Sequence, residues 1–195
     1  MFIRKLKAYV RWPLKIIAFT VFFLLLLFYF PQGTNEKSLS QTQVVNKASP
    51  VLPMRLTIPA INVNTGIQHL GGTQTGEMEV PNNALDAGWF KLGPRPGEKG
   101  SAVIAGHFNG KNGEEGVFAN LDKLKKGDKL FIEDDKGKTI TFVVRESRTY
   151  DPGYANDVFN SSDSAHLNLI TCDGVWDGIK KSYSKRLVVF ADIAH

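Results

Sequence analysis

The residue of this chain best suited to covalent chemistry is its single cysteine, Cys172. It ends an apolar run, 167–171, and is followed directly by Asp173 and Gly174. A residue at the end of a strand and next to a glycine is well placed to project from the fold, which suits a reactive thiol. An inert buried thiol and an intermolecular disulfide are the alternatives, and unpaired cysteines are often buried.

Two further residues that could take part in thiol chemistry also stand at predicted strand ends. His107 follows the apolar run 101–105 and Gly106, and Arg186 begins the last apolar run after a polar loop. Nearby cations lower the pKa of a thiol, an imidazole moves protons, and a guanidinium stabilises an oxyanion. If the three strand ends meet at one rim, the sequence predicts a site for thiol acyl transfer. Taken singly, His107 and Arg186 are also compatible with structural or solvated roles.

The elements that must position these residues are short apolar runs separated by turn residues, a pattern typical of an all-β barrel or sandwich. The predicted strands are 56–58, 61–63, 78–80, 101–105, 129–133, 139–147, 166–171 and 186–193. The turn at 134–137 joins two of them in a predicted hairpin. Besides one N-terminal transmembrane helix, the sequence predicts helix only at 117–125, as a short insertion that Gly127 closes.

The distribution of charge argues against nucleic acid as a partner. All five basic side chains of residues 1–30 lie in a segment without acids, so residues 31–195 carry 19 basic and 19 acidic groups and are formally neutral. A nucleic-acid binder would need its basic patch on the folded domain. The excess charge instead sits on a short N-terminal tail, at Arg4, Lys5, Lys7, Arg11 and Lys15.

This tail and the segment after it predict a membrane anchor. Residues 16–30 are apolar apart from Thr20, and counting back to Trp12 gives a span close to that of a bilayer, with Lys15 reaching toward the headgroups. A cleaved signal peptide is one alternative, but no small-x-small cleavage motif follows Phe30. A buried core helix is the other, although a helix that is apolar on every side is an awkward core element at a chain end.

The expected organisation follows from the charge bias, since basic residues before the span place the N-terminus in the cytoplasm. The expected parts are a basic cytoplasmic tail at 1–11, a transmembrane signal anchor at 12–30, an extracellular stalk at 31–53 and a folded domain at 54–195.

Around the three candidate residues the sequence resembles the sortase family. Leu169-Ile170-Thr171-Cys172 is similar to the Leu-x-Thr-Cys signature of sortases, 101–107 resembles the strand that leads into their catalytic histidine, and 186–189 resembles their final strand, which begins with arginine. The order of the three residues agrees, as do the separations of 65 and 14 residues. Smaller matches occur at 87–90 and 116–118, and the resemblance covers the whole of 54–195.

The resemblance implies a sortase-like β-barrel of about eight strands that cleaves a Leu-Pro-x-Thr-Gly-like sorting signal between threonine and glycine. Cys172 would form a thioacyl intermediate, His107 would act as general acid and base, and Arg186 would position the substrate and stabilise the oxyanion. Thr171 would contribute to the substrate-binding groove. An amine of a cell-wall peptidoglycan precursor would accept the acyl group, so that surface proteins become anchored at a Gram-positive-type surface.

The resemblance is greatest to class F sortases, with class D or E next. The stalk carries no Asp-Pro-aromatic lid motif, which argues against a pilus-polymerising enzyme. No cofactor and no metal are expected, and Glu114 and Glu115 are interpreted as solvated rather than as calcium ligands.

Other thiol enzymes fit the sequence less well. An L,D-transpeptidase would carry a Ser-His-Gly-Cys string, and a papain-like protease would place its cysteine early, before the histidine. The non-enzymatic alternative is a surface-anchored β-domain that binds a protein or cell-wall partner, with an inert Cys172. The two hypotheses differ in the expected reactivity of the Cys172 thiol.

Overall fold

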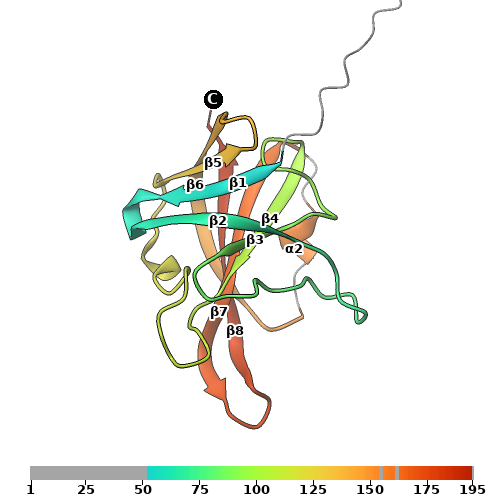
Figure 1. Cartoon of the computed structure of the whole chain (residues 1–195), viewed down its shortest axis with the longest axis vertical. Helices are drawn as coiled ribbons and strands as arrows, with labels where there is room; N and C mark the ends of the chain where they lie inside the picture. Colours follow the sequence, from blue (N-terminus) through green and yellow to red (C-terminus); the bar gives the residue numbers. More distant parts are fainter. Residues whose placement is uncertain (1–51, 154–155, 161–162, 195) are drawn as a thin grey trace, which may run out of the picture. The chain divides into compact units, whose positions relative to one another are not determined.

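In the computed structural model, the described part of the chain forms eight strands that close into a β-barrel with very little helix (Figure 1). The structure describes residues 52–153, 156–160 and 163–194. Around the barrel the strands follow the order β1-β2-β3-β4-β7-β8-β6-β5, and β5 pairs again with β1. The expected all-β barrel of about eight strands is confirmed. The strands are β1 (Pro53–Ile58), β2 (Val63–Leu70), β3 (Ala87–Phe90), β4 (Gly100–Gly106), β5 (Lys129–Asp134), β6 (Thr139–Tyr150), β7 (Ala165–Asp177) and β8 (Ser182–Ile193), and the short helices are η1 (Pro59–Ile61), η2 (Leu121–Lys123) and α2 (Asn156–Phe159).

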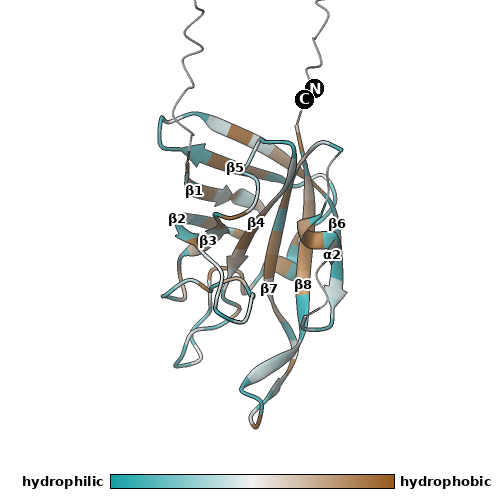
Figure 2. Cartoon of the chain, turned by 90° about the vertical axis from the view of Figure 1, so that its right-hand side faces the viewer, coloured by the Kyte–Doolittle hydropathy of each residue, from teal (hydrophilic) through white to brown (hydrophobic). Residues whose placement is uncertain are grey.

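Alternating residues of the strands fill the barrel interior. On β7 these are Leu167 and Leu169, and on β8 they are Val189 and Ala191, all fully buried in one core cluster. Because successive side chains of a strand point to opposite faces, the residues between them lie on the outer face of the barrel. Figure 2 shows the apolar residues, in brown, running along β4, β7 and β8. This alternation decides which face each candidate residue occupies.

A second hydrophobic cluster lies on the outer face of β4, β7 and β8. It contains Val103, Val188 and Phe190 from the strands and Val158 from α2. Asn168 of β7 donates a hydrogen bond from Nδ2 to the carbonyl oxygen of Val158 at 2.7 Å, which ties α2 to the sheet. The outer face of these strands is therefore packed against α2, separately from the barrel core.

β7 and β8, with 13 and 12 residues, run together past the end of the barrel as a two-stranded hairpin (Figures 1 and 2). The other neighbour of β7 is β4, which ends at Gly106, while the pairing of β7 with β8 continues to Asp177 and Ser182. The register shifts between Asp173 and Trp176. The hairpin is thus a projecting ribbon that starts immediately after Cys172.

The helix predicted at 117–125 is shorter than expected. Only Leu121–Lys123 is helical, and it is a 3-10 turn. Phe118, Leu121 and Leu124 are all buried and follow one another at a spacing of three. A 3-10 helix has three residues per turn, so residues spaced by three lie along one side of it. An α-helix has 3.6 residues per turn, so the same spacing drifts around its surface.

The strand predictions also differ from the structure in three places. The predicted strand 61–63 is not formed, because Ile61 ends η1 and Asn62 lies in the left-handed region before β2 begins at Val63. The segment 78–80 forms only an isolated bridge, between Met78 and Gly72. β3 was not expected as a strand, because it is short and contains Gly88. A β-carbon at Gly88 would overlap the side chain of Leu70, so glycine is the residue that lets this strand pack against β2.

Among the helices of residues 52–194 that the structure describes, none combines the length and apolar character needed to cross a bilayer. The anchor predicted at 12–30, the tail at 1–11 and all but the end of the stalk lie outside the described residues. These parts of the predicted organisation stay predictions.

Candidate active site

Cys172 and Arg186 are direct cross-strand partners on β7 and β8. Side chains of directly opposed residues on antiparallel strands lie on the same face, with Cβ atoms about 5 Å apart. Their neighbours Thr171 and Leu187 point toward the barrel interior, where Leu187 packs against the core and Thr171 is buried. The half-buried, unpaired thiol and the guanidinium therefore share the outer face of the barrel.

His107 reaches the same face from β4. β4 and β7 are parallel, and Ala105 lies opposite Ile170. Cys172 stands two residues beyond Ile170, and His107 stands two residues beyond Ala105, just past the end of β4. Continuing this register would place both side chains on the outer face, on neighbouring chains about 4.8 Å apart. The structure pairs Cys172 with Arg186 directly, and the strand register brings the end of β4, which leads into His107, alongside β7. The joint action of the three residues stays a prediction.

The imidazole of His107 is held by groups that the sequence analysis missed. The carbonyl oxygen of Pro81 lies 2.8 Å from Nε2, and because a carbonyl only accepts, Nε2 carries a proton and donates it to this bond. Nδ1 is left as the nitrogen that can take up a second proton. The carbonyl of His107 in turn accepts the N–H of Phe118 at 3.0 Å. No residue type in the sequence signals a backbone carbonyl as a partner.

The guanidinium of Arg186 is held by the start of the projecting hairpin. Nη1 donates to the carbonyl oxygens of Tyr183 and Lys185 at 3.0 and 2.8 Å, and Nη2 donates to Oγ of Ser182 at 3.3 Å. A guanidinium has five N–H donors, so these three bonds leave donors for a substrate oxygen. On its other side Arg186 pairs with Tyr150 of β6. The charge is fixed in place without an acidic partner among these contacts.

The protonation of the thiol reflects two opposing effects. Burial raises the pKa of Cys172 above its ordinary value, and the positive charge of Arg186 acts in the opposite direction but is the smaller effect. The resting thiol is therefore protonated at neutral pH. A base is needed to generate the nucleophilic thiolate, and Nδ1 of His107 is the nearest candidate by strand register.

Thr171 lies on the opposite face from Cys172. Its side chain is only 3% exposed, and Oγ1 donates a hydrogen bond to the carbonyl oxygen of Gly106 at 2.9 Å. The hydroxyl thus joins β7 to β4 directly behind the candidate site. The substrate-binding role predicted for Thr171 stays a prediction, and its position gives it a structural role.

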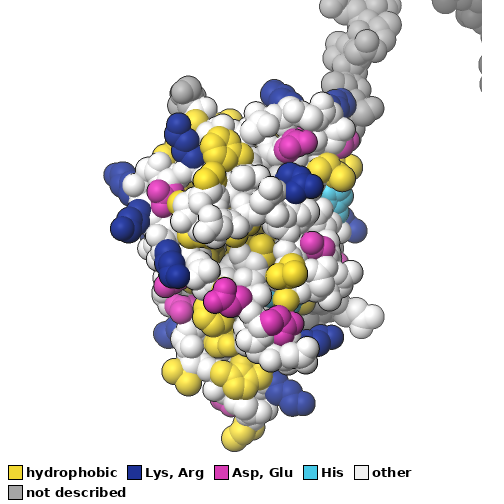
Figure 3. All heavy atoms as spheres, turned by 60° about the vertical axis from the view of Figure 1, so that its left-hand side comes forward, with side chains coloured by type: hydrophobic (Ala, Val, Ile, Leu, Met, Phe, Trp, Pro, Cys, Tyr) yellow, Lys and Arg dark blue, Asp and Glu magenta, His cyan; other side chains and the backbone are white. Residues whose placement is uncertain are grey.

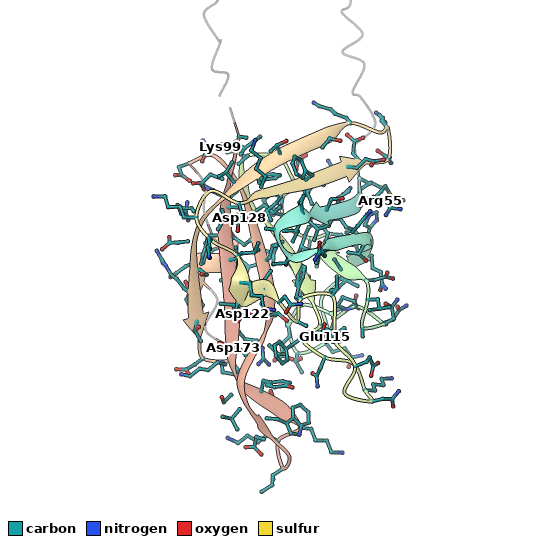
Figure 4. All side chains as sticks on the ribbon, turned by 90° about the vertical axis from the view of Figure 1, so that its left-hand side faces the viewer. Arg55, Lys99, Glu115, Asp122, Asp128 and Asp173 are labelled. Carbon is teal, nitrogen blue, oxygen red and sulfur yellow. The ribbon has the colours of Figure 1, made fainter. Side chains whose placement is uncertain are left out.

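Of the acidic residues toward this end of the barrel, Glu114 and Glu115 are predicted to be solvated. Glu115 and Asp173, labelled in Figure 4, lie toward the hairpin end of the barrel, and Glu114 accepts the backbone N–H of Asn112 at 2.9 Å. Within the part of the chain that the structure describes, no group of three or more His, Cys, Asp or Glu is arranged to hold a metal ion. Independence from metals and cofactors stays a prediction.

A closed eight-stranded barrel that carries a thiol and a guanidinium as cross-strand partners, with an imidazole just after the neighbouring strand, has the groups that thiol acyl transfer requires. A family model described as the sortase domain matches residues 56–194. The chain belongs to the sortase family.

Two curated relatives are named sortase A. Sortase A of Bacillus anthracis is 28% identical over 156 residues, which cover 80% of this chain and 62% of the relative. Sortase A of Listeria monocytogenes is 29% identical over 118 residues, which cover 60% of this chain and 48% of the relative. The chain thus spans less than two thirds of the length of either relative.

Solved structures share the fold. Sortase C-1 from Actinomyces oris matches with a TM-score of 0.59 at 24% identity, covering 73% of this chain and 71% of that one. A lid mutant of sortase A from Corynebacterium diphtheriae gives 0.58 at 24%, covering 77% and 74%. The pilus-related sortase C of Group B Streptococcus gives 0.57 at 24%, covering 74% and 68%. At this level of identity the likeness shows the fold alone, and the assignment to class F, D or E stays a prediction.

Proposed function

We propose that this protein is a membrane-anchored cysteine transpeptidase. It cleaves a Leu-Pro-x-Thr-Gly-like sorting signal between threonine and glycine and transfers the acyl group to an amine of a cell-wall peptidoglycan precursor. The observation that carries the proposal is the direct pairing of Cys172 with Arg186, next to the end of β4 that leads into His107. Membership of the sortase family supports the class of reaction.

In the first half of the reaction Sγ of Cys172 attacks the carbonyl carbon of the threonine, and the thiol proton passes to Nδ1 of His107. The carbonyl oxygen becomes an oxyanion, which the free donors of Arg186 stabilise. The carbon–nitrogen bond then breaks, His107 gives its proton to the leaving amine of glycine, and a thioester remains on Cys172.

In the second half an amine attacks the thioester carbonyl. His107 accepts the proton of the amine, the oxyanion forms again beside Arg186, and Cys172 leaves and regains its proton. Water in place of the amine would give hydrolysis as a side reaction. The same three side chains serve both halves, because the two steps are chemically the reverse of each other.

The surface next to the thiol suits an apolar signal peptide. On the same face as Cys172 and Arg186, the next cross-strand pair is Ile170 with Val188. Val188 belongs to the outer hydrophobic cluster, and Ile170 packs against it. Val188 is buried within this cluster, and the half-buried Ile170 offers an apolar contact to the leucine and proline residues that precede the scissile bond. This contact supports the choice of a Leu-Pro-x-Thr-Gly-like substrate over a charged one.

The proposed location follows from the sequence. Residues 12–30 would anchor the chain with the tail at 1–11 in the cytoplasm and the domain at 54–195 outside the cell. Protease added to intact cells should then digest the domain and leave the tail protected.

The activity can be tested on the fragment 47–195. Residues 47–195 form one compact unit, and both hydrophobic clusters draw their members from within it, so the fragment is complete in itself. It would be incubated with a Leu-Pro-x-Thr-Gly peptide library and hydroxylamine as the amine. Mass spectrometry would report cleavage after threonine and an acyl adduct on Cys172.

Cleavage that is lost in Cys172→Ala and Arg186→Ala but retained in Lys185→Ala would support the proposal. Lys185 is the matched control because it is adjacent to Arg186 and equally charged, but lies on the other face of β8. Absence of cleavage with rapid alkylation of Cys172 would overturn the substrate class and leave a thiol enzyme. A thiol that neither cleaves nor alkylates would favour the non-enzymatic surface domain.

A further inference from the structure

The hairpin that projects beyond Cys172 ends in an exposed apolar tip. Val175, Trp176 and Ile179 are 76%, 52% and 96% exposed, and they are three of the eight large apolar side chains exposed within the described residues. Figure 3 shows apolar side chains, in yellow, gathered with basic ones, in dark blue, at the lower end of the molecule. Exposed apolar groups concentrated in a few residues mark an interaction site more often than scattered ones do.

The turn at the tip is built to present its apolar residue outward. Oδ1 of Asp177 accepts the backbone N–H groups of Ile179 and Lys180 at 2.9 and 3.0 Å. Such an aspartate-centred turn fixes the loop with local hydrogen bonds. Lys181 completes the turn in the left-handed region, with φ of 49°. Ile179 is thus held at the extreme end of the ribbon.

The register shift in β7 places Trp176 on a chain of aromatic contacts. Gly174 has φ of 79°, and the N–H of Val175 is bonded to Oγ of Ser184 at 3.0 Å, so the extra residue of the bulge lies here. Beyond the bulge Trp176 opposes Tyr183, and their ring centroids lie 5.2 Å apart.

Tyr183 connects this tip to the candidate site. Its ring contacts Phe108 at 5.6 Å between centroids, and Phe108 follows His107 directly. Its carbonyl oxygen accepts Nη1 of Arg186 at 3.0 Å. The tip is therefore packed against the elements that carry the imidazole and the guanidinium, and it is not a loose appendage.

The charge of the hairpin is positive. Residues 174–185 contain Lys180, Lys181 and Lys185 and one acid, Asp177. Lys180 lies 3.9 Å from Asp177, and Lys185 pairs with Asp151 at 2.6 Å, both as exposed contacts that contribute little to stability. Lysine stems can lie along apolar surface while the ammonium groups reach toward an anionic layer.

We propose that this hairpin tip docks on the surface of an anionic lipid bilayer, with Trp176 and Ile179 entering the headgroup region. Tryptophan beside lysine is the composition typical of a segment at the membrane–water interface. The tip is narrow and convex, whereas a stable protein interface needs a patch of about 800 Å² on each partner. The inference rests on neither the proposed activity nor the predicted anchor, and it would hold the thiol close to the bilayer.

The experiment uses the fragment 47–195, in which Trp89 and Trp176 are the two tryptophans. Trp89 is 2% exposed and serves as an internal reference. The fragment would be mixed with vesicles of equal parts phosphatidylglycerol and phosphatidylcholine whose acyl chains carry bromine, a short-range quencher. Quenching of Trp176 is expected, whereas Trp176→Phe should leave the Trp89 emission unchanged.

Vesicle sedimentation tests the same contact without fluorescence. The double variant Val175→Ser, Ile179→Ser should weaken vesicle binding by about tenfold or more, because it removes apolar side-chain area that the bilayer would cover on binding. The matched control is Leu92→Ser, which is 68% exposed and follows β3 at the end away from Gly106. It should change binding by less than about twofold.

The second part of the experiment varies the lipid charge. The fragment should bind more weakly to vesicles of phosphatidylcholine alone, because these carry no anionic lipid to attract the lysines. Equal binding of the double variant and the parent fragment, or no quenching of Trp176, would overturn the proposal. So would loss of cleavage of a soluble peptide in the double variant without loss of vesicle binding, since that would assign the tip to the peptide substrate. Vesicle binding requires no turnover, so its failure is distinguishable from failure of the proposed function.

Discussion

Arg186 favours the thiolate of Cys172, while burial of the thiol favours its protonated form. His107 presents Nδ1 to this pair because the carbonyl of Pro81 occupies Nε2. At the scale of single residues, the sequence was sufficient to select the thiol, the imidazole and the guanidinium, since each stands at the end of an apolar run. It could not reveal Pro81, because a carbonyl oxygen is common to every residue and only the folded geometry brings this one to the ring.

The pH dependence of alkylation tests the balance at Cys172. Iodoacetamide reacts with the thiolate, so a pKa raised by burial should place the midpoint of the rate profile above that of an ordinary exposed thiol. Arg186→Met removes the charge that lowers the pKa, and the midpoint should move further up, with slower alkylation at neutral pH. Lys185→Met is the matched control and should leave the profile in place. A midpoint that moves down in Arg186→Met would contradict this account.

At the scale of elements, the parallel pairing of β4 with β7 directs the chain that leads into His107 toward Cys172, and the Thr171 hydroxyl joins β7 to the end of β4 at Gly106. The apolar runs at 101–105 and 166–171 predicted both strands. Their pairing could not be predicted, because strands of similar composition have many possible partners and the register depends on the closed barrel. The hairpin extension was missed because Gly174 and Gly178 interrupt the strand pattern.

Thr171→Val tests the bond between β4 and β7. The variant is nearly isosteric but leaves the buried carbonyl of Gly106 without its partner, so the free energy of unfolding should fall by about 1–3 kcal/mol. Urea unfolding would measure the change. Thr171→Ser keeps a hydroxyl and should recover part of the loss, and Thr149→Val, on a residue with an exposed hydrogen bond, is the control. Unaltered stability in Thr171→Val would count against this structural role.

Gly116 tests the backbone support of His107. A β-carbon at this position would overlap the carbonyl oxygen of His107, so Gly116→Ala must displace the histidine or its neighbours. Cleavage of the signal peptide should drop by about a hundredfold, since misplacement by about 1 Å can cost that much. Gly178→Ala, where a β-carbon meets nothing within 4 Å, should retain full activity. Equal activity of the two variants would show that the loop tolerates a side chain next to His107.

At the scale of the whole molecule, β1 closes the barrel by pairing with both β2 and β5. Leu56 and Ile58 of this strand are fully buried in the core. The all-β class could be predicted from the sequence because turn residues recur between short apolar runs. Closure between the first strand and the fifth could not, since it depends on the accumulated twist of all eight strands.

Removal of β1 should therefore abolish the fold. The fragment 47–195 should unfold cooperatively in urea, whereas a fragment beginning at Val63 loses two strand ladders and the buried side chains of Leu56 and Ile58. The shorter fragment should show no cooperative transition. Circular dichroism during urea titration would compare the two. A cooperative transition in the shorter fragment would show that the barrel does not depend on β1.

The separation of the three residues along the chain also orders the events of folding. Cys172 and Arg186 belong to one hairpin and are 14 residues apart, while His107 lies 65 residues before Cys172 and joins it through a parallel crossover. Local contacts form faster than distant ones, because less chain entropy is lost in closing a short loop. The hairpin can thus form while the barrel is still open. The Cys172 thiol would then lie next to Arg186 before His107 reaches it. Until β4 docks, the chain would carry a solvent-exposed cysteine next to a positive charge, a setting that favours the thiolate and therefore its oxidation.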